Sequence, residues 1–228
     1  MSEQLAATMR VKRACSWLLT AEFFLVIYCY GHLPPHGLAA AFAAIQPFVT
    51  AAILLRASSG VEYAELREDA HARIKLALLG GALILPMRAL LDLHLISPGP
   101  IFQLAAPVGI VLLAPLARSD KSLRRPGRLL ILGIFSFFFA AGCLAEANVL
   151  LDRSPAQRFH SSVLAKRTSG GKDRSYSLAI SPWGPVQSPA WQAVPYSLYQ
   201  SVQPSDPICI DLRHGVLNVS WYELSTCI

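Results

Sequence analysis

Long apolar stretches separated by short polar segments dominate the first two thirds of the chain. Residues 14–55 hold 42 positions without Lys or Arg, residues 129–152 hold 24, and between Lys75 and Arg118 the only basic residue is Arg88. About 20 apolar residues span the hydrocarbon core of a bilayer. The pattern therefore predicts five membrane-spanning helices, at about 14–33, 38–55, 74–95, 101–117 and 129–151.

Basic residues alternate between the predicted loops in a way that indicates orientation. Three precede the first span, four lie between the second and third spans, and five lie between the fourth and fifth, with none in the other two loops. The positive-inside rule then places the N-terminus in the cytoplasm and the chain from Asp152 onward outside it. We expect a multi-pass protein of the cell inner membrane with a periplasmic or otherwise extracytoplasmic C-terminal domain.

Two of the predicted spans have a second interpretation. A basic segment followed by an apolar stretch also begins a secretory signal peptide. The first stretch, however, carries Glu22 and lacks a convincing cleavage motif at its edge, although the Ala-rich residues 39–44 resemble one. The fourth span is short and contains Pro107 and Pro115. We interpret the first as a retained span, and whether the fourth crosses the bilayer completely stays open.

The last 77 residues, 152–228, have the alternating pattern of β-strands. Tyr176, Leu178 and Ile180 alternate with small polar residues, so one face of that segment is apolar. Further strands are expected near 159–166 and 191–199. Four to six strands with Pro and Gly between them predict a small all-β domain, a barrel or a sandwich.

A hairpin is predicted near the C-terminus from the agreement between turn length and apolar pattern. A two-residue turn at His214-Gly215 aligns three apolar pairs on one face. The pairs are Leu212 with Leu217, Ile210 with Val219, and Ile208 with Trp221.

Cys209 and Cys227 are the only cysteines in this C-terminal part. If it lies in an oxidising compartment, the two thiols can form a disulfide that stabilises a small domain. The alternatives are two free thiols, or Cys227 paired with another chain. Cys15, Cys29 and Cys143 lie within predicted spans, where we interpret them as small apolar residues.

Ionisable residues inside the predicted spans are candidates for a binding site, because a charge at bilayer depth is costly unless it is paired or hydrated. Arg88 and Asp92 are four residues apart and share a helix face, so they can form an ion pair. The functional interpretation is a polar pocket beneath the exported domain, and the structural one is an ion pair that holds helix register. The candidate residues are Glu22, Arg88, Asp92, His94 and Glu146.

Composition agrees with a membrane protein and excludes some partners. The hydrophobic fraction is 54% and the charged fraction 15%, where soluble domains have about a quarter of charged residues. The net charge of +6 comes mostly from loop residues beside apolar stretches, which favours membrane lipids rather than nucleic acid as the partner. Histidines 32, 36, 94, 160 and 214 have no metal-ligand spacing within a helix, so we expect no metal and no cofactor.

The C-terminal third carries motifs similar to those of a known group of proteins. They are Tyr-x-Leu-x-Ile at 176–180, Trp183-Gly184, the run from Tyr199 to Asp206, and Gly215 to Trp221-Tyr222. This part resembles the exported β domains that end many uncharacterised bacterial inner-membrane proteins, in which Gly often stands where this chain has Ser205. The resemblance implies an exported β domain and no particular activity.

Three functions fit these observations. The first is a non-catalytic inner-membrane anchor that presents its β domain to a protein, lipid or envelope component. The second is a small transporter or lipid-active membrane enzyme that uses the Arg88, Asp92 and Glu146 cluster. The third is a subunit of a larger complex, with the Ala-rich second span as a contact surface. No reaction motif such as a phosphate loop or a nucleophile elbow is present, so we expect the first.

Overall fold

The computed structural model describes residues 13, 16–17, 20–21, 44–45, 85, 89, 93–119, 125–170 and 174–227. The chain divides into two compact units. The first comprises Met1–Ala89 and Gly99–Glu146, and the second comprises Leu90–Pro98 and Ala147–Ile228. The short segment Leu90–Pro98, between the two parts of the first unit, therefore belongs to the second.

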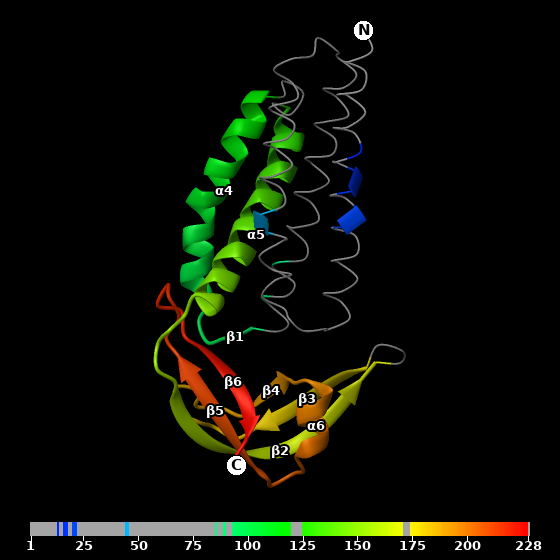
Figure 1. Ribbon diagram of the computed structural model, residues 1–228, viewed down its shortest axis with the longest axis vertical. Helices are drawn as coiled ribbons and strands as arrows, with labels where there is room; N and C mark the ends of the chain where they lie inside the picture. The colour runs from blue at the N-terminus through cyan, green and yellow to red at the C-terminus, as the bar shows by residue number, and fades with distance from the viewer. Residues whose placement is uncertain are drawn as a thin grey trace. The chain divides into compact units, whose positions relative to one another are not determined.

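Two apolar helices lie side by side in the first unit, α4 (Gly99–Ser119) and α5 (Pro126–Leu150) (Figure 1). They approach to backbone distance at Gly109, where an added Cβ would lie 3.1 Å from the Cα of Phe137. The rings of Phe102 and Phe137 stack with centroids 6.1 Å apart. A small residue such as Gly109 lets the two helix backbones come this close.

The prediction of a five-helix membrane bundle is wrong. The helices whose bounds the described residues give are α4, α5 and the short α6 (Tyr196–Ser201), and of these only α5 is long and apolar enough to cross a membrane. In α4 the apolar part is the shorter segment Gly99–Ala114. The apolar composition of a segment indicates that it avoids water. It does not by itself specify how many helices the chain forms. The predicted spans at 14–33 and 38–55, and most of 74–95, lie outside the described residues.

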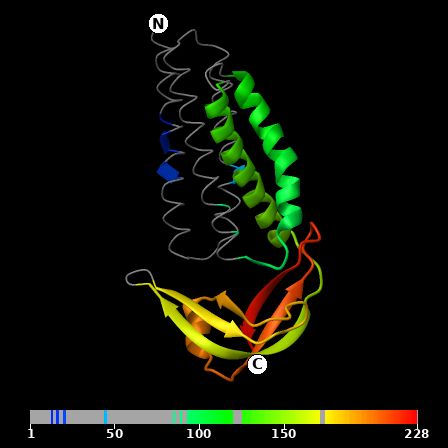
Figure 2. The ribbon, with the colours of Figure 1, turned by 180° about the vertical axis from the view of Figure 1, so that it is seen from behind.

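The second unit is built on one antiparallel sheet of six strands in the order β1-β6-β5-β2-β3-β4. The sheet curls into a half-barrel (Figure 2). The prediction of a barrel or a sandwich is therefore also wrong. The strands are β1 (His94–Leu95), β2 (Gln157–Ser169), β3 (Ser175–Ile180), β4 (Ala190–Ala193), β5 (Pro207–Arg213) and β6 (Trp221–Thr226).

The concave face of the sheet holds the core of this unit. In β5 the alternate residues Ile208, Ile210 and Leu212 are buried, as their period of two predicts. They join a cluster with Leu178 of β3 and Tyr222 of β6. The partly buried Leu198 and Tyr199 of α6 pack against this cluster, so α6 covers part of the concave face.

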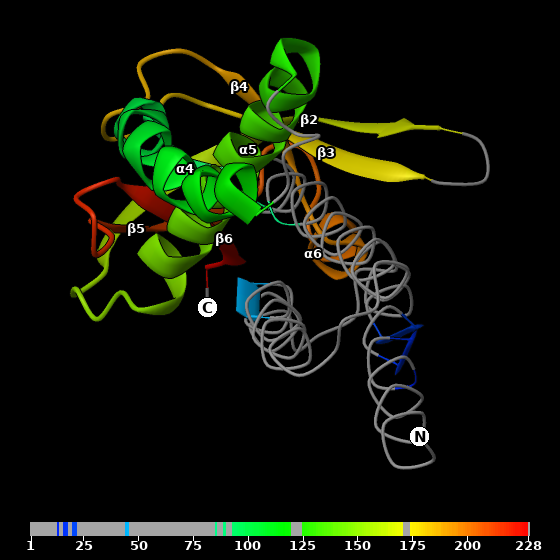
Figure 3. The same cartoon turned by 90° about the horizontal axis from the view of Figure 1, so that it is seen from above.

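A β-bulge in β2 changes which residues face the core. The register with β3 shifts between Val163 and Ala165, after which Lys166 pairs with Leu178. Lys166 then points inward, where its ammonium donates to the Val202 carbonyl at 2.7 Å and lies over the Tyr199 ring. The extra residue of the bulge bends the strand and increases its twist. Beyond it the β2–β3 pair reaches past the rest of the sheet (Figure 3).

The predicted hairpin register between the last two strands is wrong. Leu212 pairs with Tyr222, not Leu217, and Arg213 pairs with Trp221. The residues between them, 214–220, form a loop, not a two-residue turn. Residues of the chain before β2 hold this loop: the Asn148 side-chain amide accepts from Leu217 N at 2.9 Å and donates to the Val219 carbonyl at 2.8 Å.

The two edges of the sheet, β1 and β4, approach each other because of the curl. His94 on β1 donates from Nε2 to the carbonyl of Ala193 on β4 at 3.1 Å. The His94 ring also stacks on Tyr222, with centroids 5.0 Å apart. One side chain thus bridges the gap that strand pairing leaves open.

Candidate functional site

A disulfide and a histidine occupy the convex face of the sheet, opposite the core. Cys209 and Cys227 form the disulfide that the sequence predicts, with Cα atoms 5.1 Å apart and a sequence separation of 18. Cys209 faces outward because it alternates with the core residues Ile208 and Ile210 of β5. Cys227 follows the end of β6, the strand that pairs with β5.

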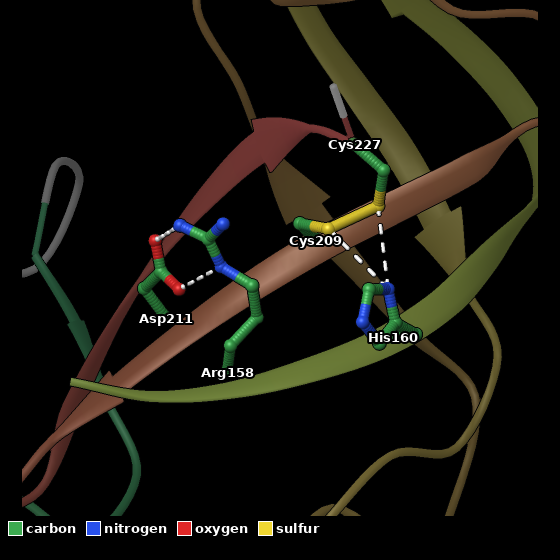
Figure 4. The surroundings of a disulfide bond; sticks show 5 residues. All are labelled: Arg158, His160, Cys209, Asp211 and Cys227. Carbon is green, nitrogen blue, oxygen red and sulfur yellow. Dashed lines mark hydrogen bonds and ion pairs between the residues drawn. A yellow bond between two sulfur atoms is a disulfide. The ribbon is translucent and has the colours of Figure 1, made fainter.

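His160 lies beside both sulfur atoms (Figure 4). On β2 it is the direct cross-strand partner of Cys209. Its Nδ1 is 3.4 Å from Sγ of Cys209 and 3.6 Å from Sγ of Cys227. The three side chains therefore come from three neighbouring strands or their ends, β2, β5 and β6.

An ion pair lies next to this group on the same face. Arg158 and Asp211 are cross-strand partners two residues away from His160 and Cys209. Arg158 donates from Nε to Oδ1 at 2.8 Å and from Nη2 to Oδ2 at 2.9 Å. The hydrogen bonds from Arg158, and then its charge, hold the pKa of Asp211 below its usual value despite partial desolvation. This bidentate pair links β2 to β5 in the same register that places His160 opposite Cys209.

The three ligand-type side chains differ in accessibility. Cys209 is buried with 3% of its surface exposed, Cys227 is partly buried, and His160 is exposed. A thiolate attacking the disulfide therefore reaches Cys227 more easily, which makes Cys209 the leaving sulfur. The ligand atoms of His160, Cys209 and Cys227 all lie within 4.8 Å of one another. Among the described residues, no other group of three or more His, Cys, Asp or Glu side chains is arranged so that it could hold a metal ion.

Sequence reasoning did not identify His160 as part of this site. The sequence did place His160 in a predicted strand. Its position opposite Cys209, however, depends on which strand pairs with β2 and in which register, and a local pattern does not indicate either. Ligand spacing within a single helix gives no indication of a group such as this one, which forms across three strands or their ends.

The predicted intramembrane cluster is resolved only in part. Glu22, Arg88 and Asp92 lie outside the described residues. His94 belongs to the second unit, on β1, and Glu146 is buried in α5 of the first unit. His94 was expected at the outer end of a helical span; it is instead a strand residue, because 93–98 leave the helical conformation before α4 begins.

An exposed aromatic residue marks a second feature of this unit, at the edge strand β4. Trp191 pairs across the sheet with Ala179, on the face opposite the core residue Leu178, and is 50% exposed. Tyr196, at the start of α6, is 52% exposed but packs on Tyr176, on the core side of the sheet. We call β4 with Trp191 the β4 edge.

Comparisons with protein-family models, with curated proteins and with solved structures find no match for this chain. The resemblance to exported β domains of bacterial membrane proteins therefore stays a prediction.

Proposed function

We propose that this protein is a membrane-anchored binding protein. In this proposal α5 crosses the membrane, and the half-barrel that follows it lies in an oxidising, extracytoplasmic compartment. There its β4 edge binds an extended segment of another membrane or envelope protein. The half-barrel is the recognition module and α5 is the anchor.

The single observation that supports the binding role is the exposure of Trp191 on the edge strand β4. A half-exposed tryptophan on an edge strand costs solvation free energy in the free protein, and Trp and Tyr are the residues that most often dominate binding energy at interfaces. The edge strand β4 also offers main-chain groups, other than the Ala193 carbonyl that accepts from His94, with which an extended peptide can pair. The short length of β4 and the prolines at 189 and 195 limit pairing with unrelated chains.

Two further observations support the compartment. The disulfide is the kind of crosslink that persists outside the cytosol. Arg125 and Arg128 flank the start of α5, whereas its last turn has no basic residue. By the positive-inside rule this asymmetry favours export of the residues that follow α5.

A photocrosslinking experiment tests the binding role. A photoreactive amino acid replaces Trp191 in the full chain, and a control chain carries it at Val216, an apolar loop residue of similar exposure. We expect a discrete protein adduct from position 191 and little from position 216, measured by gel shift and mass spectrometry in intact cells. Adducts only with lipid, or equal adducts from both positions, would exclude the proposed protein partner.

A further inference from the structure

We propose that His160, Cys209 and Cys227 form a zinc site when the disulfide is reduced. The site is distinct from the β4 edge and does not depend on the binding function proposed for it. It consists of two thiolates and one imidazole, with a fourth position open to water or to a ligand from outside the chain. Thiolate and imidazole are the ligands that zinc prefers in proteins.

The distances already present match those of a tetrahedral zinc site. Zinc lies about 2.3 Å from a thiolate sulfur and about 2.0–2.1 Å from an imidazole nitrogen, so a tetrahedral angle separates sulfur and nitrogen by about 3.6 Å. The observed separations from His160 Nδ1 are 3.4 Å to Cys209 and 3.6 Å to Cys227. Nitrogen and both sulfurs are therefore placed for coordination, and only the distance between the two sulfurs has to change.

That change is small. Two thiolates on one tetrahedral zinc ion lie about 3.8 Å apart, compared with about 2.05 Å in a disulfide. The Cα atoms of Cys209 and Cys227 are 5.1 Å apart, and Cys227 lies just beyond the end of β6, where the backbone is not held by strand pairing. Rotation about the Cα–Cβ bonds of the two cysteines can separate the sulfurs while the β2–β5 pairing stays intact. The backbone pairing of β2 with β5 sets His160 opposite Cys209 and does not depend on the disulfide sulfurs.

Formation of the site needs two electrons, supplied by a dithiol reductant such as a thioredoxin-like protein. One reductant thiolate attacks Sγ of Cys227, the Sγ–Sγ bond breaks, and its electron pair goes to Sγ of Cys209, which takes up a proton. The second reductant thiol then attacks the reductant's own sulfur in the mixed disulfide and releases Cys227 as a thiol. The reductant becomes a disulfide, and binding of Zn²⁺ displaces one proton from each cysteine.

Zinc titration of the purified full-length chain tests this proposal. Oxidised and reduced protein are compared in competition with a chromophoric chelator, with the C209S/C227S double variant as background. H160Q removes the nitrogen ligand, and H214Q, which changes another exposed histidine of the same unit, is the matched control. We expect one zinc ion per reduced chain, none above background when oxidised, and at least about a tenfold weaker affinity in H160Q than in H214Q, because even outer-shell changes cost that much.

Two results would overturn the zinc site: reduced wild-type protein that binds no more zinc than the double variant, or H160Q that binds as tightly as H214Q. If H160Q fails to fold by circular dichroism, Co²⁺ substitution of the wild type decides. A tetrahedral d–d spectrum with a thiolate charge-transfer band supports the site, and the lack of that band excludes it.

Discussion

Asn148 shows how one side chain sets local structure that sequence patterning misses. It is fully buried, and its amide and carbonyl groups bind the backbone of three loop residues, 216, 217 and 219. A buried amide without partners costs about 1–3 kcal/mol, so it is retained only where the backbone satisfies it. In the sequence Asn148 sits at the end of an apolar stretch and looks like an irregular residue of a membrane span. Its role depends on a loop nearly 70 residues later.

Asp152 is the second polar residue that anchors this loop. Its carboxylate accepts from Ser154 N at 2.8 Å, Gly215 N at 3.1 Å and the Trp221 indole at 2.7 Å. Partial desolvation would raise the pKa of Asp152, but these hydrogen bonds outweigh it and lower the pKa to about 2. Hydrogen bonds to the charged form stabilise that form, so the folded state prefers the carboxylate.

The lowered pKa of Asp152 predicts that the free energy of unfolding depends on pH through this carboxylate. Because the folded pKa lies below the ordinary value of 3.8, the contribution is complete above about pH 4 and is lost as the pH falls towards 2. Its size is on the order of 1–2 kcal/mol, after allowance for partial solvent screening. We expect D152N to be less stable than wild type at pH 7 and to approach it near pH 2, as measured by chemical unfolding of the full chain at each pH. A constant difference between the two proteins from pH 7 to pH 2 would show that the carboxylate charge is not involved.

The segment 214–220 illustrates where a correct local pattern leads to a wrong pairing. Alternation of Leu217, Val219 and Trp221 fits a strand, and His214-Gly215 fits a short turn. A two-residue turn, however, leaves Asn148 and Asp152 without their partners. The loop instead carries the positive φ angles of Gly215 (71°) and Asn218 (57°), and the strand begins only at Trp221. Satisfaction of buried polar groups by the preceding segment outweighs strand propensity in this stretch.

Gly215 is therefore predicted to be intolerant of a side chain. Its φ of 71° is unfavourable for other residues, and an added Cβ would collide with the Asn148 side chain and the Val219 carbonyl oxygen. We expect G215A to lower the free energy of unfolding by about 2–4 kcal/mol, from backbone strain and disturbed hydrogen bonds together. V216A, in the same loop and exposed, serves as the control and should change stability by less than about 0.5 kcal/mol. Equal thermal midpoints for G215A and V216A would contradict this account of the loop.

Strand β1 is an element that no local pattern could have predicted. His94 and Leu95 are two residues at the end of an apolar stretch, and they become a strand because β6 offers an unpaired edge to them. By contrast, β2, β3 and β5 lie where strands were predicted, and in β3 and β5 the large apolar residues occupy every second position of the sequence. The predicted strand at 191–199 is split into β4 and α6, with Pro195 between them.

The described part of the chain combines two apolar helices, α4 and α5, with a half-barrel that the Cys209–Cys227 disulfide crosslinks. Its described apolar surface is concentrated on α4 and α5: Ile110, Val111 and Leu130 are each more than 60% exposed. Such exposure is unfavourable in water and favourable in contact with lipid. This supports α5 as the anchor in the proposed function, with a length of 25 residues against the roughly 20 needed.

Reporter fusions to the full chain test the proposed orientation. A reporter enzyme that is active only outside the cytoplasm is fused after residue 228, and a control carries it in the basic loop after residue 125. We expect activity from the fusion at 228 and none from the fusion at 125, because the basic residues before α5 oppose translocation of that loop. The reverse pattern, or activity from both, would exclude α5 as a helix that crosses with its C-terminal end outside.

The sequence alone determined the apolar character of the first 151 residues, the helix at 129–151 within two or three residues, and the β character of the rest, because these depend on composition and on a local period. It also indicated Cys209 and Cys227 as the candidate disulfide pair, since the C-terminal part contains no other cysteine, and the structure shows that they do pair. Only the tertiary structure decided the curl of the sheet, the register of its last two strands, the recruitment of β1 and the position of His160 beside the disulfide. Those features depend on contacts between residues that are distant in the chain, and a local pattern holds no information about which distant partners a strand or a buried polar group will find.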